Sequence, residues 1–315
     1  IIATTLQAEI VKADDPCHLP KACKNAVEIA GAKTAHERDA VAMVRFLAWL
    51  DATAPQGGLT EIDVVKKLEG FRKDTNALRD ISFETISGAG PNGAIVHYRV
   101  TEDTNRAVTN GELLLVDSGG QYADGTTDIT RTIAIGEPDD DERACYTRVL
   151  QGMIAVSRIR FPKGIGGQHL DALARAPLWM AGQDYDHGTG HGIGSYLSVH
   201  EGPQSISRRN AVALQKGMIL SNEPGYYREG AFGIRIENLI VTVDAPDLEG
   251  ADARDMLAFE TLTFVPFDRR LIDVALLTDA ERGWIDRYHA DTVALLDGRL
   301  DAATQTWLQA ACAPL

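Results

Sequence analysis

Residues 113–133 read LLLVDSGGQYADGTTDITRTI, and this stretch places one aspartate on each side of a turn. Asp117 ends an apolar run, and Asp128 lies in a segment rich in β-branched residues, a pattern that predicts a β-hairpin. The midpoint of positions 117 and 128 falls close to the turn, so we expect the two carboxylates to be near cross-strand neighbours, with Cβ atoms about 5 Å apart. Like charges placed in this way destabilise a sheet unless a divalent cation lies between them.

The same pattern recurs later in the chain, where Glu223 and Glu237 lie on either side of a turn centred on Gly230. A glycine six positions before Asp117 recurs six positions before Glu223, so the offset between the two halves is 106 residues both times. This repeat indicates an internal duplication of two strand-turn-strand units. The two carboxylate pairs would then meet in one sheet and form a two-metal site at its centre.

A fifth candidate ligand is His191, in the stretch HGTGHGIG at residues 187–194. The stretch has too many glycines for a stable helix and is predicted to be a strand or loop. Four carboxylates and one imidazole, without a thiolate, favour Mn²⁺, Co²⁺, Fe²⁺ or Zn²⁺ over copper, magnesium or calcium. A single aspartate at a strand end is most often a turn cap. Five such residues at matching spacing disfavour that alternative.

Six stretches together resemble the metallopeptidase signatures of the aminopeptidase P family, the Xaa-Pro aminopeptidases. They are VDSGGQY (116–122), DITRT (128–132), HGTGHGIG (187–194), VHEGP (199–203), NEPGYY (222–227) and GIRIEN (233–238). The resemblance extends from about residue 25 to the C-terminus and is strongest to the cytosolic, three-domain type. It implies an α+β pita-bread fold, shared with methionine aminopeptidase, prolidase and creatinase, in which a pseudo-twofold axis relates two αβ halves around a curved antiparallel sheet.

Transferred residue by residue, the resemblance makes Asp117, Asp128, His191, Glu223 and Glu237 the ligands of two metal ions, usually Mn²⁺ in this family. Asp128 and Glu237 would bridge the ions, Asp117 would complete the shell of the first ion, and His191 with Glu223 that of the second. The implied nucleophile is a metal-bridging hydroxide, with Glu223 as general acid and base.

Three further histidines, His97, His187 and His200, match family positions that surround the substrate, where neutral donors would stabilise an oxyanion. From the residues alone, a histidine in an apolar strand such as 95–97 is more often a satisfied core residue. Arg235 alternates with isoleucines and therefore points the same way as Glu237. We expect it to orient that ligand, the alternative being a solvated strand face.

Composition sets broad limits on the class of protein. At 315 residues and 44% hydrophobic, the chain can bury a large core in one or two domains. A net charge of −14 argues against nucleic acid and anionic membrane surfaces as partners, and would attract the cationic amino terminus of a peptide. The four cysteines show no disulfide spacing, which predicts a cytoplasmic location. No apolar run approaches the about 20 residues of a membrane span.

We divide the chain into three parts. Residues 1–24, with a strand-like piece at 1–5, are interpreted as a linker or remnant of a preceding domain, residues 25–245 as the pita-bread metallopeptidase domain, and residues 246–315 as its C-terminal extension, with a last strand pair and two helices. Residues 25–53 are predicted to form one long or two consecutive helices, and further helices are predicted at 60–73, 139–159, 168–180, 278–296 and 301–311. Residues 87–93 are predicted to be a loop that leads to His97. The family relatives have two further domains before the catalytic one, and this chain begins with Ile, so we expect it to be the catalytic part of a longer protein.

The last two predicted helices carry the aromatic-rich segments Trp284-Ile285, Tyr288 and Trp307-Leu308. Such residues are enriched in interface cores, and the family resemblance points the same way, so we predict a homodimer. The alternative is that these residues pack the two helices onto the sheet.

The predicted function is hydrolysis of the bond between an N-terminal residue and a following proline. Prolidase, which acts on dipeptides, shares the ligand set and differs in whether the cleft beyond the proline is open. A pita-bread peptide-binding module without catalysis is disfavoured, because all five ligands and the three histidines are present. A metal-free hydrolase of the creatinase type is excluded for the same reason.

Overall fold

The computed structural model describes residues 11–13 and 15–315, and the predicted strand-like piece at residues 1–5 lies outside them. The helices are α2 (His18–Ala22), α3 (Ala26–Thr53), α4 (Glu61–Lys73), α5 (Asp140–Ser157), α6 (Gln168–Trp179), α7 (Asp279–Leu296) and α8 (Ala302–Ala311). Every helix predicted from the sequence is therefore present, with ends within two residues of the prediction. Four of them begin with a capping box, in which the N-cap residue and the third helical residue satisfy each other's backbone N–H groups.

Antiparallel strands form the centre of the protein, and every strand pair in the described part of the chain is antiparallel. The strands are β1 (Leu78–Ile81), β2 (Ile86–Ala89), β3 (Glu112–Ser118), β4 (Gly120–Tyr122), β5 (Gly125–Thr126), β6 (Ile129–Ile135), β7 (Arg160–Pro162), β8 (Gly190–His191), β9 (Ser205–Ile206), β10 (Ile219–Asn222), β11 (Gly225–Arg228), β12 (Phe232–Arg235), β13 (Asn238–Asp244) and β14 (Met256–Thr261). Residues 11–13 and 15–315 also include four short 3₁₀ turns: η1 (Ala54–Gln56), η2 (Gly90–Ala94), η3 (Arg269–Leu271) and η4 (Val274–Leu276).

Two similar ribbons reflect the repeat seen in the sequence. In the first, β3 pairs with β6 and the ribbon continues as β4 with β5; in the second, β10 pairs with β13 and continues as β11 with β12. Each ribbon starts at a glycine in the left-handed region, Gly111 with φ +89° and Gly217 with φ +87°. The N–H of each glycine donates to the partner strand, to the carbonyls of Ile135 and Thr242. The 106-residue offset therefore corresponds to a repeated backbone geometry, because a residue with a Cβ rarely adopts this φ.

The register of the second ribbon agrees with the prediction, and that of the first does not. Asn222 pairs with Asn238 and Gly225 with Arg235, so Glu223 and Glu237 face each other around the turn at Gly230. In the first ribbon Asp117 pairs with Thr130, not with Asp128. The reason is that the turn is a two-residue loop at positions 123–124, which places its centre one residue beyond the midpoint of the two aspartates. Asp117 and Asp128 are thus diagonal neighbours rather than opposite ones.

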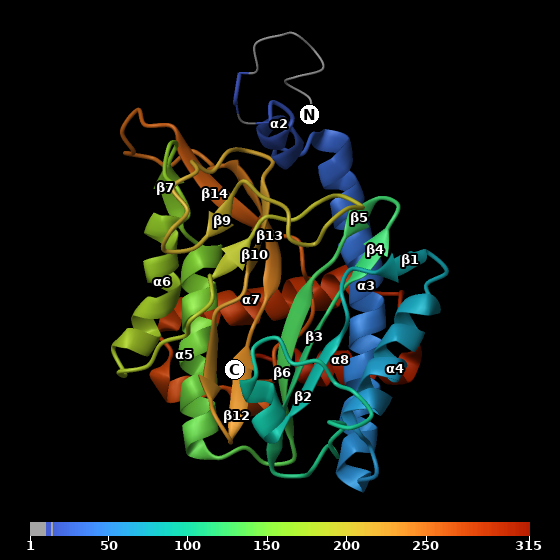
Figure 1. The fold of residues 1–315 in the computed structure, drawn as a ribbon. Helices are drawn as coiled ribbons and strands as arrows, with labels where there is room; N and C mark the ends of the chain where they lie inside the picture. Colours follow the sequence, from blue (N-terminus) through green and yellow to red (C-terminus); the bar gives the residue numbers. More distant parts are fainter. Residues whose placement is uncertain (1–10, 14) are drawn as a thin grey trace.

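The helices enclose the strands on several sides. Figure 1 shows α5 and α6 along one side, α3 and α4 along the other, and α7 and α8 behind the strands. The long helix α3 buries Met43, Phe46 and Leu50 in one cluster with Leu114 and Val116 of β3. Burial of each such side chain contributes about 1.5–3 kcal/mol to folding. Packing against α3 therefore stabilises the position of β3, the strand that carries Asp117.

Three local predictions are corrected by the structure. Residues 87–89 belong to β2 and not to a loop, and only residues 90–94 form the turn that leads to His97. Among the described residues, one strand follows residue 245, β14, which pairs with β13 and β7 in place of the expected strand pair. Within the predicted linker, residues 18–22 are helical. None of the helices in the described part of the chain combines the length and the apolar character needed to cross a membrane.

Candidate metal centre

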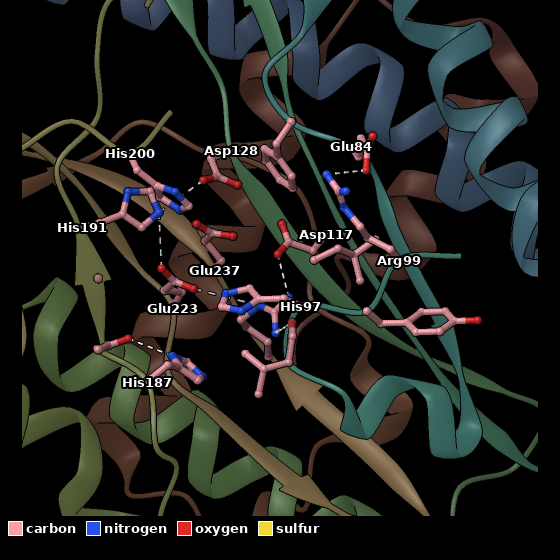
Figure 2. Close-up of a pocket in the computed structure, with 17 residues that line it drawn as sticks. Glu84, His97, Arg99, Asp117, Asp128, His187, His191, His200, Glu223 and Glu237 are labelled. Carbon is pink, nitrogen blue, oxygen red and sulfur yellow. Dashed lines mark hydrogen bonds and ion pairs between the residues drawn. The ribbon is translucent and has the colours of Figure 1, made fainter. Parts of the chain in front are cut away.

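Four acidic side chains lie where the two ribbons break. Asp117 is the second-last residue of β3, and Asp128 directly precedes β6. Glu223 directly follows β10, and Glu237 directly precedes β13. All four line one cavity of about 370 Å³ together with His191, and Figure 2 shows their side chains converging from both ribbons. The structure thus brings together the five residues that the sequence singled out as candidate ligands.

His191 is presented to these carboxylates in a defined orientation. The backbone N–H of His191 donates to Ser221 Oγ at 2.9 Å. The preceding residue, Gly190, lies so close to β10 that a Cβ at this position would be 1.9 Å from the Ser221 carbonyl oxygen. The ring Nδ1 lies 3.0 Å from the Gly192 carbonyl, which can only accept, so Nδ1 carries the proton. The lone pair of Nε2 then faces Glu223 Oε1 at 3.4 Å and Asp128 Oδ2 at 3.5 Å. This is the tautomer a metal ligand requires.

The carboxylates form an arrangement that fits a cation. Ligand atoms of Asp128, His191 and Glu237 all lie within 4.8 Å of one another. Asp117 Oδ1 and Glu237 Oε1 are buried and have no hydrogen-bond partner among the described residues. Burial, followed by the charges of neighbouring carboxylates, raises the pKa of Asp128 and of Glu237 well above the usual range. Burial also raises the pKa of Glu223. Carboxylates crowded in this way must bind protons or divalent ions.

Arg235 and Thr130 form hydrogen bonds with two of the carboxylates, those of Asp117 and Glu237. Arg235 is only 2% exposed, and its guanidinium donates to Asp117 Oδ2 at 2.6 Å. Its Nε–H donates to Thr130 Oγ1 at 3.2 Å, and the Thr130 hydroxyl donates to Glu237 Oε2 at 2.7 Å. Arg235 therefore contacts Asp117 directly and reaches Glu237 through Thr130, and its expected role in orienting Glu237 stays a prediction. The alternative of a solvated strand face is wrong.

The three further histidines lie around the same cavity. His187 is half-buried, and burial followed by the charge of Arg235 lowers its pKa to about 4. The ring of His200 lies edge-on to that of His191, with centroids 4.1 Å apart, and burial lowers the pKa of His200. His97 is exposed in a turn, so its interpretation as a core residue is wrong.

Sequence reasoning missed Tyr227 and Thr130. The Tyr227 hydroxyl accepts from Arg235 at 2.7 Å and lies 2.9 Å from His187 Nε2. Burial raises the pKa of Tyr227 to about 12, so the phenol stays protonated. Its O–H donates a hydrogen bond to His187 Nε2. Thr130 follows Asp128 by two positions, and this period of two places both side chains on one face of a strand. That spacing was the available signal for Thr130, whereas Tyr227 gave none.

Arg131 connects the site with the C-terminal part of the chain. It is 1% exposed, and its guanidinium donates to the carbonyl of Glu237 at 2.6 Å. The same group donates to the Val265 carbonyl at 2.7 Å and to the Tyr288 hydroxyl at 3.0 Å. The backbone next to Glu237 is thus tied to α7 and to the segment that leads to it.

Known proteins share this arrangement. The chain is 49% identical to aminopeptidase P2 of Arabidopsis thaliana over 93% of its own length and 42% of that protein. It is 44% identical to Xaa-Pro aminopeptidase 1 of Dictyostelium discoideum over 96% of its own length and 49% of that protein. The chain therefore spans about half the length of the curated relatives it matches.

Solved structures show the same fold. An X-prolyl aminopeptidase from Caenorhabditis elegans, described as a cytosolic enzyme with a di-nuclear active site, matches with a TM-score of 0.91 and 39% identity over 96% of this chain and 50% of that one. A Xaa-Pro dipeptidase from Bacillus anthracis matches with a TM-score of 0.71 and 29% identity, over 84% and 68% of the two chains. The expected pita-bread fold is confirmed. Residues 30–244 match the model of metallopeptidase family M24, and residues 255–315 match the C-terminal region of that family. The chain belongs to metallopeptidase family M24.

Proposed function

We propose that the chain is the catalytic part of a dinuclear metal-dependent aminopeptidase that cleaves the bond between an N-terminal residue and a following proline. The observation that carries the proposal is the convergence of four carboxylates and the Nε2 lone pair of His191 in one cavity. The names of the relatives supply the substrate class, peptides with proline second. Because the chain spans about half of those relatives, the activity of the whole protein is part of the proposal.

The proposed ligands of two divalent ions are Asp117, Asp128, His191, Glu223 and Glu237, with Asp128 and Glu237 between the ions. The partnerless oxygens of Asp117 and Glu237 support this assignment, because buried carboxylate oxygens are normally paired. Oxygen ligands with one imidazole suit Mn²⁺, which we propose as the native metal, with Zn²⁺, Co²⁺ or Fe²⁺ as alternatives.

The protein side chains divide the proposed chemical work. Two bound ions would supply a water of lowered pKa and polarise the substrate carbonyl. Glu223 is proposed to accept the proton of that water and return it to the proline nitrogen, because its carboxylate lines the same cavity as the other proposed ligands. His97, His187 and His200 are proposed to surround the reacting carbonyl, with His97 and His200 as hydrogen-bond donors to it and His187 as the acceptor of the Tyr227 hydroxyl. The lowered pKa of His187 and of His200 keeps both rings neutral near pH 7.

The experiment compares four peptides with the metal-loaded chain: Ala-Pro-Ala, Ala-Pro, Ala-Ala-Ala and N-acetylated Ala-Pro-Ala. Cleavage of Ala-Pro-Ala, with release of free alanine, and no cleavage of the last two is the expected result. Glu223→Gln should abolish turnover even where metal is retained. Cleavage of Ala-Pro alone would identify a prolidase, the second candidate, and equal cleavage of Ala-Ala-Ala would overturn the substrate class. A metal-loaded chain that cleaves none of the four would favour a binding module.

We also propose a homodimer formed by the C-terminal helices. Most of the predicted aromatic surface is internal, since Ile285, Tyr288 and Leu308 are buried. Trp284 and Trp307 remain partly exposed, and they support an interface through these two positions. Light scattering that finds a particle of 34.1 kDa over a wide concentration range would exclude the dimer. Conversion of a dimer to a folded monomer by Trp284→Ala or Trp307→Ala would support it.

A cytoplasmic location and the three-part division of the chain are further proposals. The four cysteines are all free, as expected in a reducing compartment, and the matching enzyme from C. elegans is described as cytosolic. The family models, which match residues 30–244 and 255–315, support a peptidase unit at 25–245 with an extension at 246–315.

A further inference from the structure

An exposed ion pair lies at the edge of the metal-binding cavity. Arg99 follows the turn that carries His97, and Glu84 lies on the segment that leads into β2. The guanidinium of Arg99 lies 2.6 Å from Glu84 Oε2, and the two side chains are 72% and 62% exposed. Both line the cavity. Figure 2 shows them beyond Asp117, on the side away from His191 and His200.

Arg99 is the accessible arginine among the described residues that line this cavity. The described lining residues include two arginines, Arg99 and Arg235. Arg235 is buried, and its guanidinium is occupied by Asp117, Tyr227 and Thr130. A guanidinium carries five N–H donors, and most of the Arg99 side chain faces solvent. The Arg99 guanidinium is therefore open to contact with an anionic group that enters this cavity.

The pair with Glu84 does not prevent this contact. An exposed ion pair is weak, because water screens both charges and each long side chain loses freedom when it is held. A carboxylate brought in by the substrate can replace Glu84 or bind beside it, and the planar fork of arginine suits a carboxylate at two N–H groups. Glu84 is then a competitor that limits how tightly such a carboxylate is held.

We propose that Arg99 selects peptides that carry a carboxylate on the C-terminal side of the cleaved bond. This inference rests on the proposed function, in which the bond after the first residue lies at the metal centre and everything beyond the proline extends along the cavity. The carboxylate has two sources: the terminal carboxylate of a tripeptide, or the side chain of an acidic third residue. Arg99 thus determines a preference among Xaa-Pro peptides and takes no part in the bond cleavage.

The test compares kcat/KM for three peptides on the metal-loaded chain: Ala-Pro-Ala free acid, Ala-Pro-Ala amide and Ala-Pro-Asp amide. We expect the free acid to exceed the Ala-Pro-Ala amide by about threefold to tenfold, the range of one partly screened charge-assisted contact. Arg99→Ala should bring this ratio to about one, Arg99→Glu should invert it, and Glu84→Gln should increase it. If Ala-Pro-Asp amide equals the free acid, the side chain of the third residue is a source; if it equals the Ala-Pro-Ala amide, the terminal carboxylate is the one recognised.

Arg254→Ala is the matched control, because Arg254 forms a similar exposed pair with Asp252, at 3.0 Å and with 71% and 65% of the side chains exposed, and lines a different cavity. It should leave the ratio unchanged. A ratio that Arg99→Ala does not alter, with all three peptides cleaved, overturns the inference and leaves the proposed function standing. A chain that cleaves none of the three peptides contradicts the proposed function instead.

Discussion

Thr130→Val should weaken metal binding without disturbing the shape of the site. The hydroxyl of Thr130 is buried and bridges two groups, since it donates to Glu237 Oε2 at 2.7 Å and accepts from Arg235 Nε at 3.2 Å. Valine has nearly the same shape but neither donates nor accepts. The backbone carbonyl of Thr130, which accepts from the N–H of Glu237, is unchanged by the substitution.

The size of the effect follows from the kind of hydrogen bond that is lost. A bond to a charged group contributes about 1.5–3 kcal/mol, and loss of a partner behind a metal ligand typically costs about 10-fold to 100-fold in affinity. The two ranges agree, because about 1.4 kcal/mol corresponds to a factor of ten. We therefore expect Thr130→Val to raise the Kd for Mn²⁺ by about tenfold to a hundredfold, and Thr130→Ser, which keeps the hydroxyl, to raise it less.

Calorimetric titration of the metal-free protein measures this change. Thr242→Val is the control, because Thr242 is a buried strand residue whose hydroxyl has no partner among the described residues. Loss of the Thr242 hydroxyl should leave the affinity for metal unchanged, and the free energy of unfolding should stay the same or increase. If Thr130→Val binds Mn²⁺ as tightly as the unaltered chain, or if Thr242→Val weakens binding equally, the hydrogen bond to Glu237 does not position that ligand.

Three further predictions concern the same centre. Asp128→Ala should lose both metal ions, and elemental analysis that still finds two ions per chain after reconstitution would contradict its place between them. His97→Ala and His200→Ala should lower kcat more than metal content, because donors to a developing charge act mainly in the transition state; parallel losses of both would assign these rings a structural role. In the metal-free chain the pKa of Asp128 and of Glu237 is raised by folding, so folding takes up protons. The contribution of these two groups to the free energy of unfolding is therefore fully present below the ordinary carboxyl pKa of about 4, and it is lost as pH rises through the raised pKa values of the folded chain. Urea midpoints that stay constant between about pH 5 and 8 after chelation would refute this, and the metal-loaded chain should show a smaller dependence.

Features set by neighbouring residues could be predicted from the sequence. The capping box at Thr60 and Asp63 marks the start of α4, because the two side chains satisfy backbone groups within one turn of each other. The register of the second ribbon follows from its turn, which is centred on Gly230, midway between Glu223 and Glu237. In both cases the information lies within the segment that folds.

Features set by distant residues could not be predicted in the same way. The two aspartates of the first ribbon are not equally far from their turn, and nothing in the sequence requires them to be. The pairing of Arg235 with Asp117 joins residues 118 positions apart, and it directs the guanidinium to a ligand other than the one nearest in sequence. His97 lies in a turn at the cavity rather than in a buried strand, because its surroundings come from other parts of the chain.

The contacts of Arg131 bear on which fragment of this chain can fold by itself. A buried guanidinium that bonds both the carbonyl of Glu237 and the groups of Val265 and Tyr288 makes residues before and after position 245 members of one cooperative unit. A protein cut at the sequence boundary would leave the guanidinium of Arg131, which is buried in the whole chain, without two of these acceptors. We therefore expect that the chain does not fold once α7 and α8 are deleted, and that the minimal unit for expression includes them.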